Sequence, residues 1–121
     1  MDLSLDGFRE LVGQALDGLP PEWAARLGQV IVLVEDHASP EDLAEAGFEA
    51  GGADELLGLY VGIPLTERGA LDHGLPDRIM VYRRPILSVC ETEDDVVREV
   101  QETVLHELGH HFGLLEDDLP F

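Results

Sequence analysis

The sequence predicts an α+β fold, because three short segments with strand character lie among longer segments with helical periodicity. The strand candidates are residues 30–34, 57–63 and 78–83. A chain of 121 residues is long enough for one hydrophobic core. We therefore expect residues 1–121 to form a single domain, with any active site in a surface cleft.

The first two elements are expected to be helices. Apolar residues recur at helical spacing over residues 5–19, Ser4 is a suitable N-cap, and residues 18–21 end the pattern. Pro21 can open a second, short helix that ends near Gly28, because proline is favoured at the first helical position.

The segment 30–34 is apolar at every position and rich in β-branched residues. This composition predicts a strand that is buried on both faces and therefore central in the sheet. Ser39 followed by Pro40 predicts the start of a short helix that Gly47 can end. The glycines within residues 49–54 predict a loop.

The second half of the chain contains the other two strand candidates and the longest helix. A connection interrupted by glycine and proline joins the two strands, and Pro85 can open a short helix after the second of them. Thr92 and Asp95 have the spacing of a capping box at the start of the long helix. The apolar face of this helix is expected to comprise Val96, Val97, Val100, Val104, Leu105, Leu108 and Phe112.

The charge balance limits the classes of partner. The chain has 26 acidic and 7 basic residues, a formal net charge of −19, and its basic residues are all arginine. Phosphate binding needs clustered basic residues, so nucleic acid is excluded as a partner, whereas cationic peptides would be attracted. Solubility is the simpler explanation of the acidity, and electrostatic steering of a substrate is the alternative.

Cysteine content and the N-terminal segment indicate the compartment. Cys90 is the only cysteine and has no disulfide partner in the chain, which is typical of a reducing compartment. The first residues lack the basic start and apolar run of a secretory signal, and no segment is long and apolar enough for a membrane span. We expect a cytoplasmic protein without a membrane partner.

Residues 106–110, His-Glu-Leu-Gly-His, are the most informative segment for function. On a helix, His106 and His110 lie about 40° apart around the axis and one turn apart along it, so both imidazoles can bind one metal ion. Glu107 lies on the neighbouring strip, which suits a residue that acts on metal-bound water. His111 lies about 140° from His106 and is expected to pack elsewhere. The H-E-x-x-H spacing therefore predicts a zinc site.

The third ligand is expected after the helix ends. Gly113 can adopt the positive φ that lets the chain turn back toward the histidines. Glu116 is the first candidate, Asp117 is its main rival because a one-residue shift in the turn would exchange the two, and Asp118 is the third. Accidental surface or core histidines would not be expected to bring this glycine and carboxylate cluster with them.

These residues resemble a known family. The segments 106–119, 58–68 and 75–79 are similar to those of the small bacterial zincin-like metallopeptidases, long catalogued as a domain of unknown function. The resemblance implies a minimal zincin-like fold, in which a small mixed sheet packs against helices and the H-E-x-x-H helix lies near the C-terminal end. It also implies a cleft beside an edge strand to which a peptide could add. The extended pattern is metzincin-like, with Glu116 where metzincins usually have histidine.

Together the residues predict a zinc-dependent metallopeptidase. Zn²⁺ would be bound by His106, His110 and Glu116, and Glu107 would act as general base toward zinc-activated water in peptide-bond hydrolysis. A peptide or protein is the expected substrate, and a monomer is the expected state. The alternative is a non-catalytic, zinc-containing module that binds peptides or other partners. Four candidate oxyanion stabilisers are Tyr60, His73, Tyr82 and Arg83.

Overall fold

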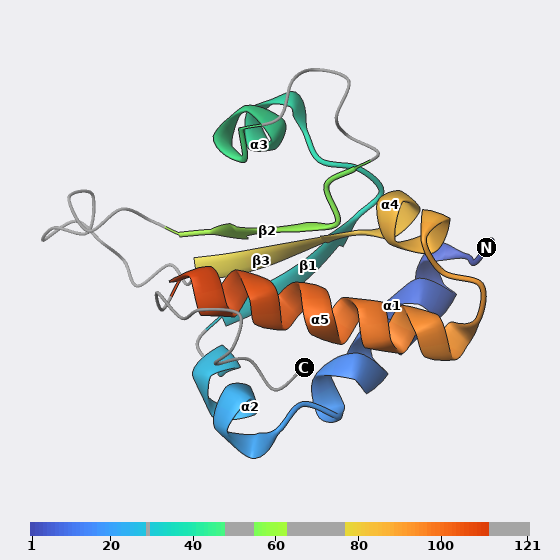
Figure 1. Cartoon of the computed structure of the whole chain (residues 1–121), viewed down its shortest axis with the longest axis horizontal. Helices are drawn as coiled ribbons and strands as arrows, with labels where there is room; N and C mark the ends of the chain where they lie inside the picture. Colours follow the sequence, from blue (N-terminus) through green and yellow to red (C-terminus); the bar gives the residue numbers. More distant parts are fainter. Residues whose placement is uncertain (29, 48–54, 63–76, 112–121) are drawn as a thin grey trace, which may run out of the picture.

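The computed structural model describes residues 1–28, 30–47, 55–62 and 77–111. Within them, the elements follow the order α1 (Leu5–Asp17), α2 (Pro21–Leu27), β1 (Val30–Glu35), α3 (Pro40–Glu45), β2 (Gly58–Val61), β3 (Asp77–Tyr82), α4 (Arg83–Ser88) and α5 (Glu93–His111). Helices α1, α2 and α5 lie on one side of the strands and α3 lies on the other (Figure 1). The predicted α+β class is confirmed.

The described strands form a mixed sheet in the order β1-β3-β2. β1 is parallel to β3, and β2 is antiparallel to it. β3 is therefore central, and its last four residues are all buried. The mixed sheet and the helix that carries residues 106–110 fit the minimal zincin-like fold that the resemblance implies.

The prediction that residues 30–34 form the central strand is wrong. Among the strands that the structure describes, β1 lies at an edge of the sheet, and its burial alternates along the strand, with Ile31 46% and Leu33 42% exposed. The other side chains of the strand pack against the main core. Helix α3 covers side chains of β2 and β3 instead of this face of β1. A run of consecutive apolar residues therefore forms a strand of which only one face is covered by other elements.

The two faces of β3 belong to different apolar clusters. Ile79 and Val81 are fully buried in the main core beneath α1 and α5. Met80 and Tyr82 point to the opposite face and pack with Leu43 of α3. The predicted apolar face of α5 lies in the main core: Val96, Val100, Val104, Leu105 and Leu108 are fully buried, and Val97 packs at its margin. Phe112 lies outside the described residues.

Capping hydrogen bonds confirm the helix starts predicted at Ser4, Ser39 and Thr92, whereas the short helix expected to open at Pro85 begins two residues earlier, at Arg83. The hydroxyl of Ser4 accepts a hydrogen bond from the backbone N–H of Gly7, and that of Ser39 accepts one from Asp42. Thr92 and Asp95 cap each other: the Asp95 amide donates to the Thr92 hydroxyl, and the Thr92 amide donates to the Asp95 carboxylate, both at 3.1 Å. This capping box fixes the first turn of α5.

The structure also bears on the expectation that no segment spans a membrane. In the portion of the chain that it describes, none of the helices combines the length and the apolar character that crossing a membrane requires.

Candidate active site at the end of the long helix

Helix α5 and strand β2 run side by side in the same direction (Figure 1). They approach closely at Gly58, where an added Cβ atom would lie 2.5 Å from Cγ2 of Thr103 and 2.9 Å from the carbonyl oxygen of Met80. No larger side chain fits this position without displacement of the helix or the strand. Gly58 therefore allows α5 to pack directly on the edge strand.

Two residues beyond this contact, the edge strand binds the predicted general base. The backbone N–H of Tyr60 donates a hydrogen bond of 2.8 Å to Oε1 of Glu107. The register explains why this amide is available: Tyr82 donates its backbone N–H to the carbonyl of Leu57, so every second residue from Leu57 faces β3. The backbone groups of Gly58 and Tyr60 face the outer edge of the sheet.

The structure brings three of the predicted site residues together. His106 and His110 are exposed on adjacent turns of α5, and Glu107 between them is partly buried. Nδ1 of His110 lies 3.8 Å from Oε2 of Glu107, which is an ion pair only while the imidazole is protonated. Glu107 thus has one oxygen held by the strand and the other directed toward a histidine.

The third predicted ligand lies outside the described residues, as do Gly113, Asp117 and Asp118. Among the described residues, no group of three metal-binding side chains is placed to hold an ion. The donor set of the motif nevertheless fits zinc, since imidazole nitrogen with carboxylate oxygen is a common combination in catalytic zinc sites. Both histidines are solvent-accessible, which leaves their imidazoles open to a metal ion.

The candidate oxyanion stabilisers are engaged elsewhere or not described. The hydroxyl of Tyr60 donates to Oδ2 of Asp77 at 2.7 Å. Tyr82 is fully buried beneath α3, and Arg83 is buried with its guanidinium bound to Asp36 and to the carbonyl of Leu3. His73 lies outside the described residues.

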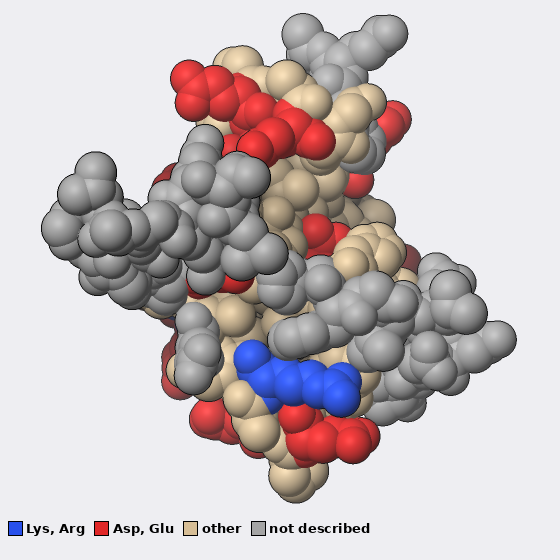
Figure 2. Space-filling model, turned by 90° about the vertical axis from the view of Figure 1, so that its left-hand side faces the viewer, with Lys and Arg blue, Asp and Glu red and all other residues tan. Residues whose placement is uncertain are grey.

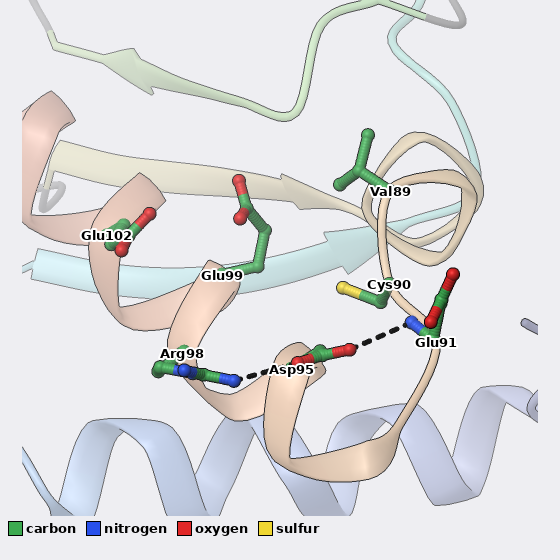
Figure 3. A pocket seen from close by; sticks show the side chains of 7 residues that line it. All are labelled: Val89, Cys90, Glu91, Asp95, Arg98, Glu99 and Glu102. Carbon is green, nitrogen blue, oxygen red and sulfur yellow. Dashed lines mark hydrogen bonds and ion pairs between the residues drawn. The ribbon is translucent and has the colours of Figure 1, made fainter.

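A hollow of about 260 Å³ borders the candidate site. It lies between α5 and the segment that leads into β2, and its lining comprises Leu56, Leu57, Gly58, Glu99, Glu102, Thr103, His106 and Glu107. A second hollow, of about 330 Å³, lies farther along α5 and shares Glu99 and Glu102 with the first (Figure 3). Of these two hollows, the first is the one whose lining includes His106 and Glu107.

Sequence reasoning missed two parts of this site. The Tyr60 amide is a backbone donor, so no side-chain pattern could have indicated it. Glu99 and Glu102 carry a usable signal, because they precede His106 by seven and four residues and therefore share its side of the helix.

Acidic side chains are spread over one face of the molecule. Figure 2 shows acidic side chains in several separate areas of one face, whereas basic side chains form one compact area there. This distribution agrees with the formal net charge of −19.

Comparisons with known proteins give a family match and one similar solved structure. The family model described as zincin-like metallopeptidase matches residues 27–120. The solved structure of a conserved hypothetical protein from Thermus thermophilus is similar at a TM-score of 0.57 and 30% sequence identity, covering 91% of this chain and 94% of that chain. A search of curated proteins gave no significant match. The extent of the family match, which includes β1 to α5, shows that the chain belongs to the zincin-like metallopeptidase family.

Proposed function

We propose that this protein is a zinc-dependent peptidase with its active site at the C-terminal end of α5. In this proposal His106, His110 and Glu116 bind Zn²⁺, and Glu107 is the general base. The observation that carries the proposal is the hydrogen bond of 2.8 Å from the Tyr60 amide to Glu107, which holds a carboxylate between the two histidines at the end of a groove. Membership of the zincin-like family supports the same reaction class.

The positions of these side chains indicate a separate catalytic role for each. Zinc bound there would lower the pKa of a water molecule to about 7 and polarise the peptide carbonyl. Glu107 would accept the proton of that water on the oxygen that the strand leaves free, and would then deliver it to the leaving nitrogen. The Tyr60 amide would keep the carboxylate in position through both transfers.

The groove beside Gly58 supports an extended peptide as the substrate. Apart from the Tyr60 N–H, which is bound to Glu107, the outward backbone groups of β2 offer hydrogen bonds to an added strand, and the hollow beside them extends from Gly58 to His106 and Glu107. A peptide bound as an additional strand would pass its backbone in front of the catalytic carboxylate.

Metal content tests the first part of this proposal. Protein purified without added metal should carry about one zinc ion per chain, measured by elemental analysis. His106→Ala and His110→Ala should each lose it, whereas His37→Ala, an exposed histidine remote in sequence, should retain it. Wild-type protein that stays metal-free when zinc is supplied would contradict the proposal.

Peptide cleavage tests the second part. Glu107→Gln should retain zinc and lose cleavage of a diverse peptide pool, scored by mass spectrometry, while Glu93→Gln, the same change in the exposed first turn of α5, should cleave as wild type does. If zinc-loaded wild type leaves the pool intact, the site belongs to a peptide-binding module and the peptidase proposal is wrong.

A further inference from the structure

The side chain of Tyr60 ties the end of strand β2 to the central strand. In the antiparallel register Tyr60 lies opposite Ile79, and Asp77 precedes Ile79 by two residues, so Tyr60 and Asp77 are diagonal neighbours on one face of the sheet. The Tyr60 hydroxyl donates a hydrogen bond of 2.7 Å to Oδ2 of Asp77, a length typical of a hydroxyl bound to a carboxylate. The ring packs at the margin of the main core. Tyr60 is thus attached to β3 through its side chain.

This attachment is important because the backbone groups of Tyr60 face away from β3. Leu57 and every second residue after it turn their backbone groups toward β3, whereas those of Tyr60 face the outer edge of the sheet. There the Tyr60 N–H donates to Oε1 of Glu107 at 2.8 Å. Tyr60 also lies one residue before the end of β2 at Val61, and the ends of elements open more readily than their centres. The bond to Asp77 therefore holds the residue whose amide binds the general base.

The two hydrogen bonds of Tyr60 connect the central strand to the candidate site. The connection runs from Asp77 of β3 through the ring and backbone of Tyr60 to Glu107 of α5. It is closely packed at Gly62, where an added Cβ would lie 3.3 Å from Cε1 of Tyr60 and 3.6 Å from Oδ1 of Asp77. Because a tyrosine side chain is a rigid ring on two rotatable bonds, displacement of its hydroxyl also displaces its backbone.

We propose that Tyr60 and Asp77 form a positioning pair for Glu107, in which the Tyr60 side chain, bound to Asp77, keeps the Tyr60 amide in place beneath the catalytic carboxylate. This inference rests on the proposed peptidase function. Asp77 contacts neither the substrate nor the metal ion and acts through Tyr60. Proton transfer depends steeply on the placement of the general base, so a small displacement of the amide reduces turnover. It leaves the two histidines on their helix, and zinc binding is retained.

Turnover of a peptide that the wild type cleaves is the first test. Tyr60→Phe removes the hydroxyl, keeps the ring, and should lower kcat about tenfold, or about 1.4 kcal/mol in the barrier, with KM and zinc content unchanged within about twofold. Asp77→Ala should have the same effect, and the two changes together should cost no more than either alone, because they break one bond. Asp77→Asn retains an oxygen acceptor and should recover kcat to within about threefold of wild type.

Amide hydrogen exchange, followed residue by residue by NMR, tests the pair without any need for turnover. The N–H of residue 60 should exchange about tenfold faster in Tyr60→Phe and in Asp77→Ala than in wild type, and Glu107→Ala, which removes the acceptor, gives the upper limit of this effect. The Tyr82 N–H, bound to the carbonyl of Leu57 in the same pair of strands, is the internal reference and should keep its exchange rate. Equally faster exchange of the Tyr82 N–H would show general loosening of the sheet and would overturn the positioning role.

A second bond between a tyrosine and an aspartate supplies the matched control. The Tyr82 hydroxyl donates to Asp42 of α3 at 3.2 Å on the opposite face of the sheet, so Asp42→Ala deletes the same kind of acceptor away from the candidate site. It should lower the free energy of unfolding and leave both kcat and the exchange at residue 60 unchanged.

Three results would contradict the positioning pair: an equal loss of kcat in Asp42→Ala, a rise in KM with kcat unchanged in Asp77→Ala, or unchanged exchange at residue 60 in Asp77→Ala. Absence of cleavage by zinc-loaded wild type would refute the peptidase proposal alone, because the exchange measurement still decides whether Asp77 holds the Tyr60 amide against Glu107.

Discussion

The backbone amide of Tyr60 and the carboxylate of Glu107 are joined by a hydrogen bond of 2.8 Å, although 47 positions separate them in the sequence. This bond forms because α5 and β2 run in the same direction, and one turn of the helix covers nearly the same distance as two residues of the strand. Four residues of a helix rise about 6 Å and two residues of a strand span about 6.6 Å. The contact of Thr103 with Gly58 is therefore followed, one helical turn later, by the bond of Glu107 to Tyr60.

This relationship predicts that Gly58→Ala impairs both stability and the candidate site. The added Cβ would lie 2.5 Å from Cγ2 of Thr103, so helix and strand must separate. We expect a loss of about 1–3 kcal/mol in the free energy of unfolding, as in other overpacked cores, measured by chemical denaturation. Peptidase activity should fall by more than zinc content does, because the Tyr60 amide moves away from Glu107 while the histidines stay on one helix.

Two variants provide controls for this prediction. Thr103→Ser removes the methyl group that the new Cβ meets, so Gly58→Ala with Thr103→Ser should recover part of the lost stability. Gly13→Ala is the matched glycine substitution, since a Cβ at that position of α1 has no neighbour within 4 Å. It should be stabilising by about 0.5–1 kcal/mol. A Gly58→Ala protein as stable as wild type would show that α5 and β2 are not in close contact.

Local rules predicted the helices of this fold better than its sheet. Ser4, Ser39 and Thr92 were identifiable as caps because the bonds they make lie within four residues in the sequence. The position of residues 30–34 in the sheet was not identifiable in this way. Whether a strand lies at an edge depends on which distant segments pair with it, and a run of apolar side chains reports only local composition.

The same distinction between local and tertiary interactions applies to the candidate site. The two histidines and Glu107 could be predicted from sequence, because helical geometry alone brings them together. The Tyr60 amide and the groove between Gly58 and Glu99 depend on the packing of α5 against a strand more than 30 residues away in the chain. Only tertiary structure determines such contacts, so the surroundings of the general base could not be predicted.

The capping box predicts how stability depends on acid pH. Backbone amides, first that of Glu91 and then that of Thr92, hold the pKa of Asp95 below its ordinary value. Because the folded pKa is the lower one, the contribution of Asp95 to stability is present above the unfolded pKa of about 4 and is lost as the pH falls through the folded pKa. Asp95→Ala should therefore lower the melting temperature at pH 7, and the difference from wild type should shrink at acid pH.

A neighbouring acid separates capping from charge in this experiment. Asp94→Ala removes a first-turn carboxylate of α5 without removing the capping hydrogen bonds, and should change the melting temperature less at pH 7. Thr92→Ala removes the other half of the box and should cost about 1 kcal/mol. Equal effects of Asp94→Ala and Asp95→Ala would indicate that helix charge, and not the hydrogen bonds, stabilises this end of α5.

For Tyr82 we expect the opposite pH dependence, a loss of folding stability at alkaline pH. Burial, followed by the charge of Asp42, raises the pKa of Tyr82 above its ordinary value of 10.0. A group whose folded pKa is raised contributes stability that is present below the unfolded pKa and is lost as the pH rises toward the folded pKa. Tyr82→Phe removes a hydrogen bond of 3.2 Å to Asp42 and should cost about 1 kcal/mol near neutrality. Above about pH 10 the stability of wild type should fall toward that of the variant.

The ionisation of Tyr82 can be followed directly. The chain has two tyrosines, so Tyr60→Phe leaves Tyr82 as the sole source of tyrosinate absorbance. In the folded variant this absorbance should develop only at a pH well above 10, or together with unfolding monitored by circular dichroism. Tyrosinate formation near pH 10 in the folded protein would show that Tyr82 is accessible to solvent.

The final prediction concerns the ligand that completes the proposed zinc site. Glu116→Gln should weaken zinc binding by at least about a hundredfold, measured against a competing chelator, because it replaces an anionic ligand with a neutral amide. Asp117→Asn and Asp118→Asn remove the same charge from adjacent positions and should change the affinity by less than about threefold, as expected for charges that do not bind the ion directly. A large loss of zinc affinity in Asp117→Asn with none in Glu116→Gln would show that Asp117, and not Glu116, is the third ligand. Equal small losses in all three variants would mean that this acidic segment only attracts the ion, and that the third ligand lies elsewhere in the chain.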